Sequence, residues 1–93
     1  MTVYEYAQKL AGPVMISSCD GAYTLFRGPR EEIPPELRDL ELRAVHGCLY
    51  EGEDGMLHST WGPNAATRLW VNAPAHVVKR AAMRESDLYM EVE

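Results

Sequence analysis

The chain has 93 residues, of which 46% are hydrophobic and 25% are charged, and these values are typical of one small globular domain spanning residues 1–93. Fourteen acidic residues outweigh nine basic ones, and the formal charge of −5 argues against direct nucleic-acid binding through a dominant basic surface. Two cysteines are too few for a disulfide scaffold, and the N-terminus lacks the pattern of a signal peptide. No apolar run approaches the roughly 20 residues of a membrane span. We therefore expect a cytoplasmic protein without membrane contact.

A helix is predicted at the N-terminus. Thr2-Val3-Tyr4-Glu5 has the form of a capping box, in which the Thr2 hydroxyl and the Glu5 carboxylate each accept from the other's backbone N–H. Gly12-Pro13 ends the helix, which we expect to lie across the next two strands. Apolar residues follow at helical spacing in Val3, Tyr6 or Ala7, and Leu10.

Residues 14–28 form the clearest hairpin pattern in the chain. Two β-rich runs flank Asp20-Gly21, which can both adopt the positive φ of a two-residue type I′ turn. Such a loop fixes the register and places Ile16 opposite Leu25 and Cys19 opposite Ala22.

The segment from Gly28 to Asp39 contains Pro34-Pro35, which allow at most one helical turn, with Ile33, Leu37 and Leu40 directed into the core. The alternation from Leu40 to Tyr50 then predicts a third strand. Its inward side is expected to carry Leu40, Leu42, Ala44, His46, Cys48 and Tyr50.

The second half of the chain continues the pattern of strands and helices. A turn at residues 52–55 separates the third strand from a fourth at Met56 to Trp61, and Thr67 to Asn72 is a fifth strand, with a short helix through Ala65-Ala66 as the alternative. A helix follows Pro74 and ends near Glu85, and Asp87 to Val92 is predicted as a terminal strand. The fold class is therefore α+β: an antiparallel sheet of about five to six strands packed against an N-terminal helix and a helix in the C-terminal half.

The metal-ligating side chains are His46 and Cys48 on one strand face, with Cys19 and His58 on neighbouring strands. Sulfur and imidazole are the ligands that zinc prefers, but structural zinc sites usually take them in tight pairs from turns. His46 and Cys48 are two positions apart on a strand, so their side chains lie roughly 6.5–7 Å apart. This distance is too long for the direct hydrogen bond through which His46 would activate Cys48 as a nucleophile. Burial as ordinary core residues is favoured, and we predict no catalytic residue, metal ligand or cofactor.

Lys79, Arg80 and Arg84, with Arg68 and Trp70 before them, have the residue types that contact phosphates and stack a base. In a net-negative chain these few basic residues are a weak nucleic-acid footprint, and a solvated helix face is the favoured explanation.

Aromatic and acidic side chains are the stronger indication of a partner. Five tyrosines and two tryptophans exceed what one small core conveniently holds, and these residue types are enriched at interface hot spots. The predicted partner-binding residues are Glu31, Glu32, Glu36, Asp39, Glu53, Asp54, Trp61 and Trp70.

The order of motifs resembles that of small uncharacterised proteins of phage and prophage genomes: a capped helix, a DG hairpin, L-F-x-G, and I-P-x-E-L before a strand. The resemblance covers about the first half of the chain and its C-terminal end, whereas residues 48–84 depart from it. The matching residues are Asp20-Gly21, Leu25-Phe26-Arg27-Gly28, Ile33-Pro34-Pro35-Glu36-Leu37, the strand from Leu40, and Asp87-Leu88-Tyr89-Met90-Glu91-Val92.

This resemblance implies a protein that binds a host protein, and anti-CRISPR and other anti-defence inhibitors are one kind. We therefore expect a non-enzymatic protein-binding module that inhibits a host nucleic-acid-targeting defence complex by contacting its basic surface. One alternative is an assembly protein that self-associates through a sheet edge or apolar patch. Another is a zinc-binding or cysteine-dependent module.

Overall fold

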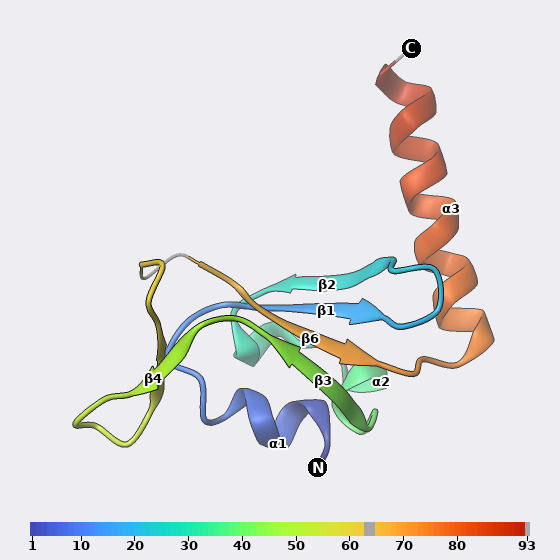
Figure 1. Ribbon diagram of the computed structural model, residues 1–93. Helices are drawn as coiled ribbons and strands as arrows, with labels where there is room; N and C mark the ends of the chain where they lie inside the picture. The colour runs from blue at the N-terminus through green and yellow to red at the C-terminus, as the bar shows by residue number, and fades with distance from the viewer. Residues whose placement is uncertain (63–64, 93) are drawn as a thin grey trace.

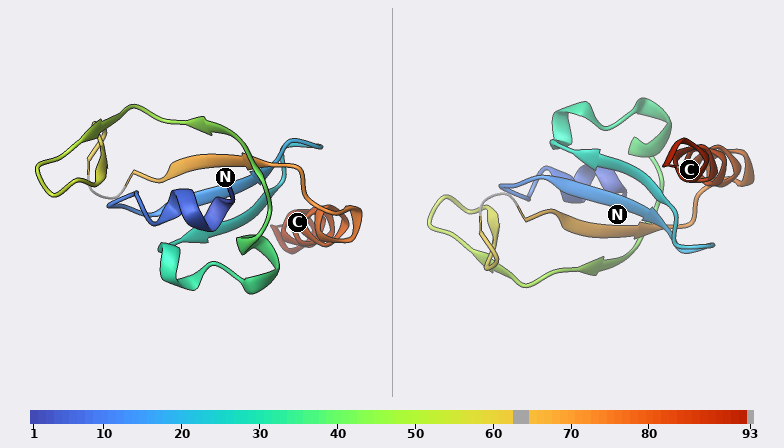
Figure 2. Two further views of the ribbon diagram at one scale, coloured as in Figure 1. Left: turned by 90° about the horizontal axis from the view of Figure 1, so that it is seen from below. Right: turned by 90° about the horizontal axis from the view of Figure 1, so that it is seen from above.

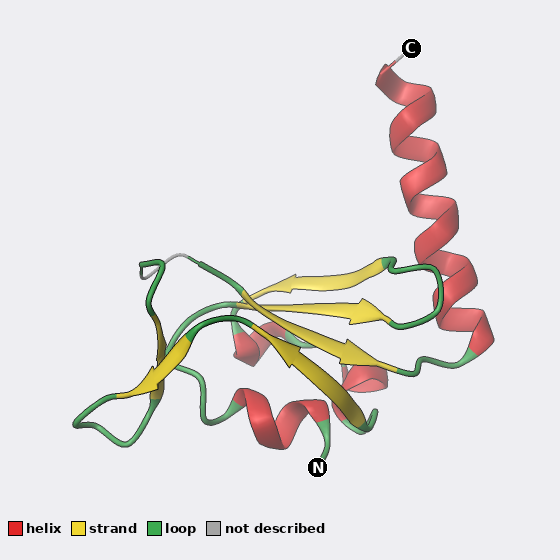
Figure 3. Ribbon diagram, in the orientation of Figure 1, coloured by secondary structure: helices red, strands yellow, loops and turns green. Residues whose placement is uncertain are grey.

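The computed structural model describes residues 1–62 and 65–92, with side chains described over 1–62 and 65–84 (Figure 1). Four strands form a mixed sheet in the order β2-β1-β6-β3, and β4 and β5 pair separately as a two-stranded sheet. The α+β class with helices at both ends is confirmed (Figure 3). The elements are α1 (Val3–Ala7), β1 (Val14–Ser18), β2 (Thr24–Gly28), the 3-10 turn η1 (Arg30–Glu32), α2 (Pro35–Arg38), β3 (Leu42–His46), β4 (Leu49–Glu51), β5 (Leu57–Ser59), β6 (Thr67–Val71) and α3 (Ala75–Val92).

The two central strands of the main sheet run parallel to each other. β1 pairs with β6 from Val14↔Thr67 to Ser18↔Val71, while β1–β2 and β3–β6 are antiparallel. The prediction of one wholly antiparallel sheet is wrong at this pair and in the separation of β4–β5. The direction in which distant strands pair depends on the path of the intervening chain, and alternation within a strand carries no information about it.

Helices cover one face of the main sheet and leave the other without a helix over it. α1, η1 and α2 lie beneath the sheet in Figure 1, and the view from above in Figure 2 shows the opposite face, with α3 rising at one end of it. Apolar side chains of β1 and β6 pack against those of the covering helices and turns. The buried core comprises Val3, Ala7, Leu10, Val14, Ile16, Leu25, Ile33, Leu37, Leu69, Val71, Val77 and Ala81.

Helix α1 begins with the predicted capping box. The Glu5 N–H donates to Thr2 Oγ1 at 3.2 Å, and the Thr2 N–H donates to Glu5 Oε1 at 3.1 Å. Val3 and Ala7 are the residues that this short helix buries.

The β1–β2 connection is wider than a two-residue turn. The Ser18 N–H bonds the Tyr23 carbonyl at 2.9 Å, which leaves four residues in the loop, and the positive φ values fall on Gly21 and Ala22. Beyond Ser17↔Thr24 the register shifts, so that Ile16 lies opposite Phe26. The predicted Ile16–Leu25 pairing is wrong because Leu25 is the extra residue of a β-bulge.

The predicted pairing of Cys19 with Ala22 is also wrong. The Cys19 N–H bonds the carbonyl of Val71 at 2.9 Å, so the chain after β1 continues along β6 and does not fold back toward Ala22.

The predicted third strand divides into β3 and β4 at Gly47-Cys48. A second register irregularity lies between Leu42 and Ala44, so Leu42 and Val45 both pack against the core. The inward set predicted from alternation is therefore wrong at Ala44, His46, Cys48 and Tyr50, all of which are exposed.

The β4–β5 hairpin is fastened to the segment after α1. The Leu57 N–H donates to the Lys9 carbonyl at 2.7 Å, and the Ala11 N–H donates to the Leu57 carbonyl at 2.9 Å. The turn predicted at residues 52–55 is confirmed by the bond from the Gly52 N–H to the Met56 carbonyl at 2.8 Å.

Helix α3 continues to Val92, so the predicted helix end near Glu85 and the terminal strand from Asp87 are wrong. No glycine or proline interrupts residues 75–93, and short-range alternation there competes with an uninterrupted helix.

The predicted strand at residues 67–72 is confirmed by β6, and the alternative helix through Ala65-Ala66 is wrong. Pro63 and Asn64 lie outside the described residues.

Candidate functional site

The four sulfur and imidazole side chains of the zinc-binding alternative are not brought together as a metal site. Cys19 is exposed beside the Val71 end of β6, whereas Cys48 is exposed two residues after His46, which pairs with Arg68 near the other end of that strand. Over residues 1–62 and 65–84, no group of three or more histidine, cysteine and carboxylate side chains is arranged to hold a metal ion. Both cysteines are free thiols.

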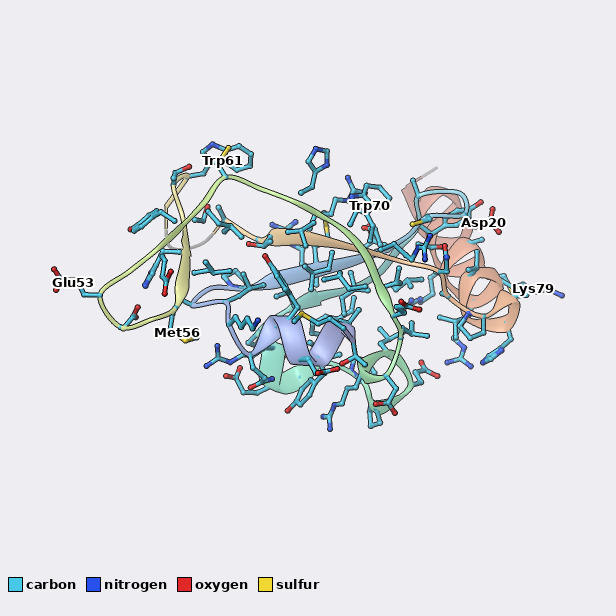
Figure 4. The ribbon with its side chains drawn as sticks, turned by 60° about the horizontal axis from the view of Figure 1, so that its bottom comes forward. Asp20, Glu53, Met56, Trp61, Trp70 and Lys79 are labelled. Carbon is cyan, nitrogen blue, oxygen red and sulfur yellow. The ribbon has the colours of Figure 1, made fainter. Side chains whose placement is uncertain are left out.

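The predicted acidic contact residues form two separate groups. Four of them are exposed on η1, on α2 and at the C-terminal cap of α2, beneath the main sheet: Glu31, Glu32, Glu36 and Asp39. Glu53 and Asp54 occupy the tip of the β4–β5 hairpin (Figures 1 and 4). Several of them already have partners. Glu36 Oε1 lies 3.1 Å from Arg80 Nη1 of α3, and Glu31 Oε1 lies 3.3 Å from the Nε of its neighbour Arg30.

Aromatic side chains flank the β4–β5 hairpin. Tyr50 of β4 is 53% exposed and stacks on His58 of β5 with ring centroids 5.6 Å apart, and Trp61 after β5 is 69% exposed. Both oxygens of Asp54 lie 3.1 Å from His58 Nε2. The Met56 N–H and this imidazole hold the pKa of Asp54 below its usual range, so its carboxylate is charged at neutral pH.

A shallow depression of about 290 Å³ separates this hairpin from the main sheet. Tyr50, His58 and Ser59 line its hairpin side, and Thr67 of β6 lies across from them. The hydroxyl of Ser59 accepts from the Trp61 N–H at 3.1 Å and is therefore engaged in the local turn.

The basic residues predicted to lie together belong to two surfaces. Lys79, Arg80 and Arg84 are exposed on α3, where Arg80 pairs with Glu36. Arg68 and Trp70 instead project from β6, and Figure 4 shows Trp70 on the side of the sheet away from α1.

On this open face of the sheet, Arg68 and Trp70 form a stacked pair. The Arg68 guanidinium carbon lies 4.3 Å from the centroid of the indole ring, and its Nε donates to Ser17 Oγ at 3.0 Å. Ser17 is fully buried, so its hydroxyl anchors the arginine from below. The register places Met15 and His46 on either side of Arg68, and Arg27 beyond Met15.

Sequence reasoning missed Arg27, and it directed His46 into the core. One signal was available: the segments that form the four strands contain three arginines and no aspartate or glutamate, although the chain has fourteen acidic residues. This uneven charge distribution points to a shared surface only when the strand register is known, because strand pairing shows which side chains share a face.

Tyr89 lies in the part of α3 whose side chains are outside the description. None of the described helices combines the length and the apolar character needed to cross a membrane.

Comparisons with protein-family models, with curated proteins and with solved structures found no match to this chain.

Proposed function

We propose that this chain is a non-enzymatic protein-binding module, and that it contacts a basic partner through the β4–β5 hairpin. The observation that carries the proposal is the combination of exposed Tyr50 and Trp61 with exposed Glu51, Glu53 and Asp54 around one hairpin. Tyrosine and tryptophan are enriched among the few residues that supply most of the binding energy at protein interfaces, and carboxylates around them favour a partner of opposite charge.

The attachment of the hairpin supports this role. Two backbone hydrogen bonds join β5 to Lys9 and Ala11, and the Asp54–His58 contact joins the tip of the hairpin to β5. A preorganised hairpin loses little conformational entropy when it binds. The acidic side chains of α2 are weaker candidates, since Glu36 is already paired with Arg80.

We propose further that the partner is a nucleic-acid-handling protein of the host cytoplasm, and that the acidic hairpin occupies its basic surface as an inhibitor does. The formal charge of −5 and the sequence resemblance to small phage proteins support this identity. It is the same class of partner that the anti-defence interpretation implies.

The test compares binding by variants with matched changes at different sites. A host protein captured by the tagged chain is purified, and its Kd is measured by calorimetry against wild type, Trp61→Ala, Glu53→Lys, Met83→Ala and Glu31→Lys. Trp61→Ala is expected to weaken binding by tenfold or more, as loss of an interface hot spot does. Glu53→Lys is also expected to weaken it.

The two controls make comparable changes elsewhere: Met83→Ala truncates another exposed apolar side chain, and Glu31→Lys reverses another acidic charge. Met83 is 60% exposed on α3, and Glu31 lies on η1, so neither variant alters the hairpin. Equal losses for Glu31→Lys and Glu53→Lys would show that only overall charge matters. Self-association that Trp61→Ala abolishes, with no captured partner, would favour the assembly alternative.

A further inference from the structure

We propose that the open face of the four-stranded sheet binds single-stranded nucleic acid, with a base stacked on Trp70 and phosphates held by Arg27 and Arg68. This site is formed by β2, β1, β6 and β3, and it is independent of the β4–β5 hairpin. It also departs from the expectation, based on net charge, that the chain makes no direct contact with nucleic acid.

Charge is distributed unevenly between the sheet and the rest of the chain. All fourteen acidic residues lie outside the four strands of the main sheet, while Arg27, Arg43 and Arg68 lie within them. A net charge of −5 describes the whole molecule, but a phosphate within a few ångströms of a surface responds to the local charges. Arg27 and Arg68, which the register places on the open face, therefore make that face locally cationic on an acidic protein.

The strand register arranges the basic side chains in a row. Arg27 lies beside Met15, Met15 beside Arg68, and Arg68 beside His46, across all four strands. Three strand spacings of about 4.8 Å place the ends of this row roughly 14 Å apart. A line of positive and neutral side chains of this length suits an extended backbone with repeating phosphates.

The next row supplies a place for a base. Trp70 lies between Ser17 on β1 and Ala44 on β3 and is the largest side chain of this row, and its indole is partly exposed. Arg68 is already stacked on the ring at 4.3 Å and is held there by Ser17. In the part of the chain that the structure describes, the terminal nitrogens of Arg68 have no protein partner, so they remain available to a phosphate.

The shape of the face favours a single strand over a duplex. Stacking on an aromatic side chain requires a base whose flat face is exposed, whereas the bases of a duplex are stacked on each other. Figure 2 shows the face without a covering helix, and α3 forms a wall at one end of it. A flexible strand can lie on this surface along the row of arginines.

The experiment measures fluorescence anisotropy of labelled single-stranded RNA and DNA oligonucleotides of about ten bases, with a duplex of the same sequence, over a range of salt concentrations. Trp70→Ala is expected to weaken single-strand binding by about 5- to 150-fold, the effect of losing one stacked base. Arg27→Gln is expected to reduce the steepness of the salt dependence by about 0.7, the contribution of one phosphate contact on a single strand.

Lys79→Gln is the matched control, because it removes one positive charge from exposed α3 and none from the sheet face. Trp61→Phe leaves Trp70 as the single tryptophan, and its fluorescence is expected to be quenched on binding. Circular dichroism is used to check that Trp70→Ala is folded. If Trp70→Ala does not fold, Arg27→Gln still tests the proposal, because it changes an exposed side chain. Absence of binding at low salt, equal binding of the duplex, or an equal loss with Lys79→Gln would overturn the proposal.

Discussion

Both carboxylate oxygens of Asp54 lie 3.1 Å from Nε2 of His58, four residues further along the β4–β5 hairpin. The Met56 N–H donates to the same carboxylate at 2.9 Å. The hydrogen bond from the Met56 N–H, and after it the contact with His58, hold the pKa of Asp54 below its ordinary value of 3.8. The stabilisation they provide is therefore present above pH 3.8 and is lost as the pH falls through the lower pKa of the folded state.

We predict that the Met56 amide resonance follows this titration in NMR spectra, with a midpoint below 3.8 in the wild type. Asp54→Asn should remove the transition, and Glu53→Gln, at an adjacent exposed position, should leave it in place. A wild-type midpoint at or above the ordinary value would contradict the hydrogen-bonded hairpin.

The capping box of α1 predicts a measurable loss of stability in Thr2→Ala. The hydroxyl of Thr2 accepts from the Glu5 N–H at 3.2 Å, and alanine leaves that donor without its cap. The free energy of unfolding should fall by about 1 kcal/mol in chemical denaturation. Gln8→Ala, at an exposed position at the end of the same helix, should change it by no more than about 0.5 kcal/mol.

Two glycines with nearly equal φ angles provide a matched pair. Gly21 has φ +79° and Gly55 has φ +77°, but a Cβ at Gly21 would lie 2.4 Å from a ring carbon of Tyr23, whereas a Cβ at Gly55 meets no atom within 4 Å. Gly55→Ala should cost about 1–2 kcal/mol from backbone strain alone. Gly21→Ala should cost more, since Tyr23 packs against the core and must move. Equal melting temperatures for the two variants would contradict this difference.

The ion pair between Arg80 and Glu36 is expected to contribute little to stability. The two side chains are 58% and 45% exposed, so water and salt screen their attraction. A double-mutant cycle with Arg80→Ala and Glu36→Ala should give a coupling energy below about 1 kcal/mol, which decreases further at high salt. A larger coupling would mean that this pair, which joins α3 to α2, adds substantially to the attachment provided by burial of Val77 and Ala81.

Features that depend on a few neighbouring residues could be predicted from the sequence. The Thr2–Glu5 cap, the helical turn at Pro35 and the turn at residues 52–55 all arise from local hydrogen bonds and restricted backbone angles. The strand at residues 67–71 was also predictable from its β-branched and aromatic composition.

Single-residue irregularities defeated the prediction of side-chain direction. The extra residue at Leu25 shifts the β1–β2 register, and the irregularity between Leu42 and Ala44 reverses the expected faces of β3. Because side chains alternate with a period of two, one added residue moves all that follow to the other side. His46 therefore lies on the open face, where the alternation predicted a core position.

The sequence by itself determined which side chains this protein has for contacting a partner, including Trp61, Glu53, Arg68 and Trp70. Only the tertiary structure decided which of them share a surface. The parallel pairing of β1 with β6 places Ser17 beside Trp70, and β2 and β3 add Arg27 and His46 to the same face. These contacts join residues far apart in the chain, and strand pairing, which local residue patterns do not specify, determines them.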